Sequence, residues 1–213
     1  FNTIGWASQN FLFNTVDALL GTNIGTENPA KVTARISDSD VTAGGGVAVK
    51  AWSDSSVSSV VTNAALSVGV SVTNTPTNAI SVAPVIAMNK VSTAVKGYIE
   101  GSFAKAVAGD IEIEAKDTSF IDSDVASSSI AVGTNLLGQS SLAVSVGISS
   151  ARNDIRGDVA AYIEASGSTA DPVEAEAGNV TISATQSATI DTSAVASAIG
   201  VSVSGSGKST GFA

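Results

Sequence analysis

The sequence predicts an all-β protein: a parallel β-helix, or β-solenoid, built from three repeats of about 64 residues behind a partly helical N-terminal segment. Three observations support this prediction. Short blocks of sequence recur at a nearly constant spacing, and apolar and polar residues alternate within the blocks. Most apolar residues are Ala, Val or Ile, which suit narrow sheets, and large aromatics are few.

The recurring blocks define the repeat. One pattern, Val-x-(Ala or Gly)-x-Ile, occupies residues 32–36, 95–99 and 159–163, so its copies begin 63 and 64 residues apart. A second pattern, (Val or Ile)-x-(Val or Ile)-x-Ala, begins at residues 47, 111 and 180, which are 64 and 69 residues apart. The five additional residues are expected in a loop over 165–177, which contains Pro172 and several Ser, Gly and Glu residues.

Two further blocks extend the comparison. Residues 66–70, 130–134 and 199–203 share a pattern of the Ser-Val-Gly-Val type. Residues 80–82 match 144–146, and the third copy of this block is expected to begin at residue 213. The predicted units are therefore residues 32–94, 95–158 and 159–213, the last of them incomplete.

Alternation within the blocks predicts strands. Val32, Ala34 and Ile36 are separated by Thr33 and Arg35, so the apolar set lies on one face and the polar set on the other. A unit of this size with few aromatics buries little surface alone, and stacking on neighbouring units would create a continuous core. A coil of such a helix is expected to take roughly 18 to 25 residues, so one repeat would contain two or three coils.

Two other all-β arrangements are open at this point, an antiparallel β-sandwich and a tandem of small β-domains. The sandwich predicts tight hairpins with Asn-Gly or Asp-Gly turns. Neither dipeptide occurs in the sequence, which favours the solenoid.

Residues 1–31 differ from the rest because they hold many of the large side chains. Leu12, Val16, Leu19 and Leu20 fit one face of a helix, and Gly21 is a suitable stop. The segment is interpreted as a cap or insertion packed on the coil, and the alternative is a contact site for another subunit.

Composition excludes several classes of function. The net charge is −9, so the surface repels phosphate backbones and nucleic acid is not expected as a partner. The sequence has no Cys and no His, which excludes disulfides and removes the commonest general base and metal ligand. No apolar run reaches about 18 residues, so no membrane span is expected.

The motif string resembles the repeat regions of filamentous-haemagglutinin-like adhesins, which are very large exported bacterial proteins. It consists of the Val-x-(Ala or Gly)-x-Ile block, the block that follows Gly46, Asp110 and Asn179, a Ser/Thr/Asp-rich stretch, and the Ser-Val-Gly-Val strands. Residues 10–14 and 17–21 resemble insertions between such repeats. The resemblance implies an elongated stalk or filament at the bacterial cell surface, and we expect the sequence to be part of a longer chain.

Paired carboxylates are the main candidates for chemistry. They are Asp38 with Asp40, Asp122 with Asp124, and Glu112 with Glu114. Two carboxylates on one strand face could flank a glycosidic bond. The glutamates, however, align with Ala48 and Lys50 and with Thr181 and Ser183, which is typical of a decorated outer strand face. No catalytic or cofactor-binding residue is therefore assigned. Calcium is considered at Asp38, Asp40, Asp122 and Asp124, because oxygen ligands at the turns of acidic solenoids hold this ion.

Three other motifs suggest specific functions. Residues 204–210 resemble the tail of a phosphate-binding loop, but Ser202 stands where the motif requires Gly. Thr181, Thr185 and Thr189 suggest ice binding, which needs a regular threonine array on one face, but they are expected at mixed inward and outward positions. Tyr98 and Tyr162 occupy equivalent outward positions, with Arg35 in the first unit, and predict either a stacked ladder between units or a sugar-contacting strip.

Together these features predict a structural or adhesive segment of an extracellular bacterial protein, not an enzyme. Its expected partners are neighbouring repeats, further copies that assemble head to tail into fibres, a surface polysaccharide, or a partner cell surface. The alternative is a β-helix protein that binds or cleaves polysaccharides.

Overall fold

The computed structural model describes residues 2–4, 28–137, 140–166, 172–205 and 207–213. Every element assigned within these residues is a β-strand, so the all-β prediction is confirmed. The helical segment predicted around Leu12 to Leu20 lies outside the described residues. In the part of the chain that is described, no helix is long and apolar enough to cross a membrane.

The strands form three sheets in which every pairing is parallel. The first long sheet contains β4 (Val47–Ser71), β7 (Ile111–Asn135) and β10 (Val180–Ser204). The second long sheet contains β5 (Thr77–Glu100) and β8 (Ser141–Glu164), extended by β1 (Asn2–Ile4), β2 (Ala30–Ser37) and β11 (Ser209–Phe212). The corner sheet contains β3 (Asp40–Ala43), β6 (Phe103–Ala106) and β9 (Val173–Ala175).

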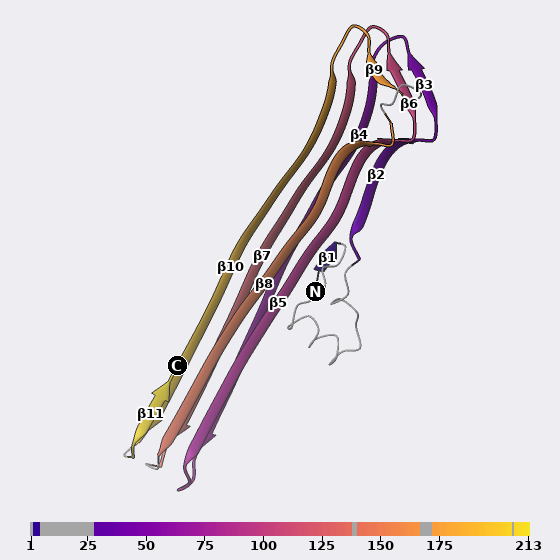
Figure 1. Ribbon diagram of the computed structural model, residues 1–213. Coiled ribbons are helices and arrows are strands. Elements are labelled where there is room, and N and C mark those ends of the chain that lie inside the picture. The colour runs from indigo at the N-terminus through magenta and orange to yellow at the C-terminus, as the bar shows by residue number, and fades with distance from the viewer. Residues whose placement is uncertain (1, 5–27, 138–139, 167–171, 206) are drawn as a thin grey trace.

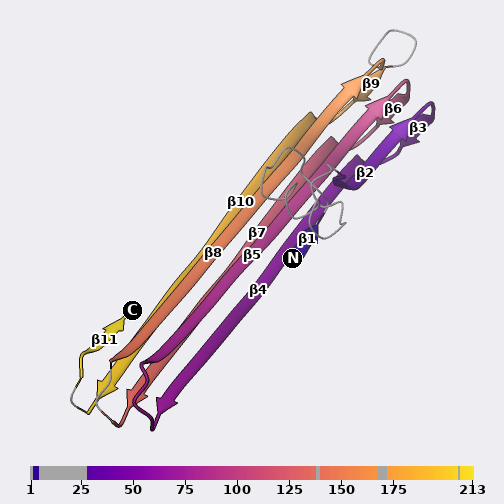
Figure 2. The same cartoon turned by 90° about the horizontal axis from the view of Figure 1, so that it is seen from below.

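The chain winds through these sheets in order. It runs along β4, turns back along β5, crosses β6 and then enters β7, which lies beside β4 (Figure 1). The end that carries β3, β6 and β9 is called the corner end, and the end where β4 leads into β5 and β7 into β8 is called the turn end. Figure 2 shows the long strands side by side between these two ends. The arrangement is compatible with a parallel β-helix.

The pairing register agrees with the blocks aligned in the sequence. Val32 pairs with Val95, which pairs with Val159, and Ile111 lies between Val47 and Val180. The fourth block differs by one residue from the prediction. Its third copy begins at Phe212, which pairs with Val144, because four residues separate β10 from β11 whereas five separate β7 from β8.

The predicted coil length is wrong. Apart from the short strand β1, strand partners in the described chain are 63 to 69 residues apart, as for Arg35 with Tyr98 and Ile111 with Val180, so one repeat forms one coil and not two or three. The reason is the length of the strands, which run for 24 or 25 residues without an internal turn. The estimate of roughly 18 to 25 residues assumed short strands with frequent corners.

Odd-numbered residues of β4, β5, β7 and β8 point inward, between the two long sheets. Near the corner end they are large and apolar, and Ile99, Ile111 and Ile113 are fully buried there. Toward the turn end the interior consists of small residues, such as Ala79 and Ala131. The interior therefore narrows along the molecule.

Glycine permits a close approach of the two long sheets. A Cβ atom built on Gly97 would lie 2.7 Å from the carbonyl oxygen of Glu114, and one on Gly147 would lie 2.5 Å from that of Ser197. Side chains at these inward positions would push the sheets apart.

A polar row crosses the middle of the interior. Asn89 and Asn153 pair on neighbouring strands, and Asn89 Nδ2 donates to Asn153 Oδ1 at 2.8 Å and to Ser123 Oγ at 3.0 Å. Asn153 Nδ2 in turn donates to Thr192 Oγ1 at 2.6 Å. Asn2 of β1 occupies the same register position as these two asparagines. The row links both long sheets and neighbouring coils, so it specifies their register.

Candidate functional site

The outer face of the first long sheet carries a group of charged and aromatic side chains near the corner end. Because the odd-numbered residues of β4 and β7 fill the interior, the even-numbered ones point outward. The group comprises Lys50, Trp52 and Asp54 on β4, and Glu112, Glu114, Lys116 and Thr118 on β7.

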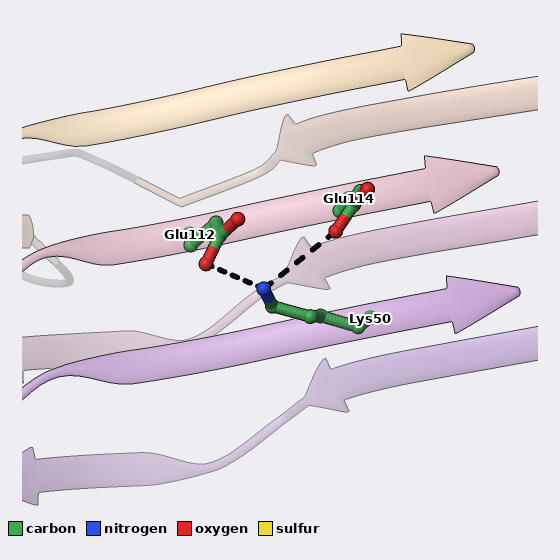
Figure 3. A network of polar contacts seen from close by, with 3 residues as sticks. All are labelled: Lys50, Glu112 and Glu114. Atoms are coloured by element: carbon green, nitrogen blue, oxygen red, sulfur yellow. Dashed lines mark ion pairs between the residues drawn. The ribbon is translucent and has the colours of Figure 1, made fainter.

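Lys50 binds both glutamates of the adjacent strand. Its Nζ atom lies 2.7 Å from Glu112 Oε2 and 3.6 Å from Glu114 Oε2, as Figure 3 shows. The hydrogen bond to Glu112 raises the pKa of the Lys50 ammonium above its ordinary value, with a smaller contribution from the charge of Glu114. Glu112 and Glu114, one of the three carboxylate pairs considered for catalysis, thus share one cation.

Trp52 is 60% exposed although tryptophan usually buries most of its surface. The Lys50 ammonium lies 5.8 Å from the centroid of its ring, within the range of a cation–π contact. Beside the ring is a shallow hollow of about 250 Å³, lined by Trp52, Ser53, Asp54, Lys116 and Thr118. An apolar ring face flanked by a carboxylate, an ammonium and a hydroxyl can bind a ligand that is apolar on one side and hydroxylated at its rim.

Sequence reasoning missed this hollow. The alternation of the strand could have revealed it. Val47, Val49 and Ala51 form the inward face, so Trp52, which comes next in the chain, must point outward. The register also places Lys116 directly beside Trp52.

The two aspartate pairs considered for calcium lie on different elements. Asp38 and Asp40 lie at the corner between β2 and β3, where Asp38 has a φ of 49° and accepts a hydrogen bond from Ser37 Oγ at 3.2 Å. Asp122 and Asp124 point outward from the middle of β7. Across the ranges that are described, no group of three or more His, Cys, Asp or Glu residues could hold a metal ion.

The stacked ladder predicted for the tyrosines is present. The rings of Tyr98 and Tyr162 are 4.8 Å apart between centroids and 3° from parallel. Arg35 Nη1 donates to Tyr98 Oη at 3.4 Å, so the ladder continues into the first unit. Partial burial raises the pKa of the Tyr162 phenol above its ordinary value.

The phosphate-binding motif and the threonine array do not have the geometry that their proposed functions require. Lys208 precedes the strand β11 and not a helix, so residues 204–210 lack the helix N-terminus of a phosphate-binding loop. Thr181, Thr185 and Thr189 all point outward on β10, which corrects the mixed orientation predicted from the sequence. Their neighbours in register on β7 are Glu112, Lys116 and Phe120, so the threonines do not form part of a uniform array.

Comparison with known proteins found no match: no family model, no curated protein and no solved structure is significantly similar to the chain.

Proposed function

We propose that this chain is a structural segment of a long, exported bacterial surface protein and that it has no catalytic role. In this proposal the segment consists of three stacked units, residues 32–94, 95–158 and 159–213, preceded by a capping segment at 1–31. The observation that carries the proposal is the uninterrupted parallel pairing of β4 with β7 and of β7 with β10, over 25 residues in each case.

This pairing suits a rigid spacer. Each long strand shares its backbone hydrogen bonds with the next coil along its whole length, so bending the stack would break many bonds together. Similar residues stack at equal positions, as in the inward row of Val95 and Val159 and the outward pair of Tyr98 and Tyr162. An extracellular location and an adhesive role agree with the acidic, Cys-free composition and with the resemblance of the repeats.

The same geometry supports assembly end to end. β4 and β10 pair on one side only within the described chain, so each presents unpaired backbone groups along its outer edge. Exposed strand edges recruit further strands. Another coil, either from a longer chain or from a second copy, would continue both long sheets.

The test is fibre formation by the purified chain, followed by light scattering and negative-stain electron microscopy over a range of concentrations. The proposal predicts unbranched fibres, because stacking adds copies along one axis. Particles that stay monomeric at the highest concentrations would contradict it.

Two proline variants provide the control. Ser55 and Ser56 are adjacent on β4, so their backbone N–H groups point to opposite sides of the strand. In one of the two variants, Ser55→Pro or Ser56→Pro, the proline removes a backbone hydrogen bond to β7, so the melting temperature falls. In the other variant the proline removes only an N–H group on the open edge of β4. The variant that retains its melting temperature should lose the fibres.

A second candidate function, polysaccharide binding, is favoured by the hollow beside Trp52. The exposed ring could stack on a sugar while Asp54, Lys116 and Thr118 bind its hydroxyls. Because Trp6 and Trp52 are the two tryptophans of the chain, a Trp6→Phe variant reports on Trp52 alone. Addition of neutral or acidic polysaccharides should shift its fluorescence, and Asp54→Ala should weaken the shift. An unchanged spectrum with every polysaccharide would exclude this function.

A further inference from the structure

The charged residues are distributed very unevenly along the long strands. Residues 55–89, 125–151 and 192–207 contain no Asp, Glu, Lys or Arg, and the five residues that follow Lys208 contain none either. The first two runs each include the end of one long strand, the connection after it and the beginning of the next strand, and the third includes the end of β10, with β11 beginning directly after Lys208. Since all three turns lie together at the turn end, one half of the molecule is nearly uncharged (Figure 1). We call residues 55–89, 125–151, 192–207 and 209–213 the uncharged half.

The outer face of the first long sheet is apolar in this half. Three outward rows follow one another there, and eight of their nine residues are Leu, Ile or Val. The rows are Leu66, Ile130 and Ile199; Val68, Val132 and Val201; and Val70, Thr134 and Val203. On the two outer strands these residues are 44 to 70% exposed.

The interior of the same half is polar by comparison. Inward residues there include Ser81 and Ser129, whose hydroxyls are hydrogen-bonded at 2.9 Å, and Gly133. At the corner end the order is the reverse, with isoleucines inside and Lys50 and its glutamates outside. The outward apolar residues of the two outer strands therefore add little to the stability of this fold, and their exposure requires another explanation.

The size of the apolar face limits the kind of partner. The exposed, outward Val60 and Val195 extend the face beyond the three rows, to about ten residues along the outer strands. At about 3.3 Å per residue, on three strands about 4.8 Å apart, the face measures about 450 Å². Two such faces in contact would bury about 900 Å² in total, which is the size of a weak and reversible interface. The second long sheet adds a smaller apolar face that includes Ile80, Val82 and Ile86, each at least half exposed.

Lipid is a poor match for this surface. A copy inserted in a bilayer would place the open edges of β4 and β10 in hydrocarbon, where unpaired backbone groups cost several kcal/mol each. In a face-to-face contact between proteins those edges stay at the rim, in water. A flat ladder of β-branched residues is also complementary to itself, and sheets pack face to face at about 10 Å.

We infer that two copies of this chain associate laterally, through the apolar outer faces of their first long sheets in the uncharged half. Val132, at the centre of the three rows, lies near the two-fold axis of such a pair. The contact uses the face of the sheet, whereas end-to-end stacking uses its edges. Lateral association gives double-width particles and end-to-end stacking gives longer ones, so the two proposals can fail separately.

Cysteine cross-linking tests the inference, because the chain has no cysteine of its own. Val132→Cys should form disulfide-linked dimers under mild oxidation, with a yield severalfold above that of Thr118→Cys. Thr118 is the matched control because it also points outward from β7 but lies in the charged half. Equal yields from the two variants would overturn the inference.

Charge insertion provides a second test. Val68→Lys combined with Val201→Lys should abolish the dimer in sedimentation velocity while the melting temperature changes little, because both side chains are exposed. Ala48→Lys combined with Thr181→Lys, at outward positions of the same strands, should leave the dimer intact. A dimer that survives the first pair, or a monomer that instead floats with phosphatidylcholine vesicles, would overturn the inference.

Discussion

Asn89 and Asn153 have a role that few polar residues could fill, because their amides both donate and accept hydrogen bonds inside a narrow interior. Asn89 is fully buried and binds Asn153 on the neighbouring coil and Ser123 on the opposite sheet. An apolar residue of similar size would pack there, but it would leave both partners unsatisfied. The sequence analysis did not single out Asn89. Alternation along β5 is enough to give it an inward position, but its partner Ser123 depends on how the two sheets face each other, which the sequence pattern does not specify.

Replacing Asn89 with Ala should lower the free energy of unfolding by about 1–3 kcal/mol, since Ser123 and Asn153 lose a buried hydrogen-bond partner. Chemical denaturation with urea measures this change. Asn78→Ala is the control, because Asn78 points outward from the same strand and is exposed. A change as small as that of the control would show that the polar row does not stabilise the fold.

The Tyr162 phenol should ionise above pH 10.0, because partial burial raises its pKa. A Tyr98→Phe variant keeps the stacked ring and leaves Tyr162 as the one tyrosine, so its ultraviolet absorbance titration is unambiguous. Since the pKa is higher in the folded than in the unfolded chain, the stability from this group is complete below pH 10.0. It is lost as the pH rises from there through the folded pKa. A midpoint at or below pH 10.0 would contradict the stacked ladder.

At the scale of elements, the repeats in the sequence predicted the register of the strands more reliably than the length of the coil. Equivalent residues stack in a parallel array, so the alignment of Val32, Val95 and Val159 was also a prediction of their pairing. The coil length depends on where the chain turns, and long Ser/Thr-rich stretches give no strong turn signal. The repeat alignment also placed Lys50 and Glu114 at equivalent positions, and in the structure these two residues are direct neighbours that form an ion pair.

Burial along one register position provides an element-scale prediction. Ile113 and Ile182 pair directly, but Ile113 is fully buried on the middle strand whereas Ile182 is 46% exposed on the outer strand. Ile113→Ala should cost about 2–5 kcal/mol of unfolding free energy, and Ile182→Ala considerably less. Thermal or urea unfolding of the two variants gives the comparison. If the two substitutions lowered the unfolding free energy equally, the outer strand β10 would have to be covered in solution, contrary to this prediction.

At the scale of the whole molecule, the two ends of the long strands differ in chemistry. The corner end has an apolar interior and a charged exterior, and the turn end has a small, hydroxyl-rich interior and an apolar exterior. The corner end therefore supplies most of the hydrophobic stabilisation of the fold, and the turn end supplies surface for association. A rod assembled end to end from such segments would carry its apolar faces along one side.

The central claim is that one repeat forms one full coil, so that residues 64 apart are immediate neighbours. Spin labels at Ser58→Cys and Asp122→Cys, a directly paired outward couple, test this by electron paramagnetic resonance. We predict the strong dipolar broadening of labels on adjacent strands, about 4.8 Å apart at the backbone. If two or three shorter coils separated these residues, the backbone distance would be about 10 to 14 Å and the broadening much weaker, and the proposed winding would be contradicted.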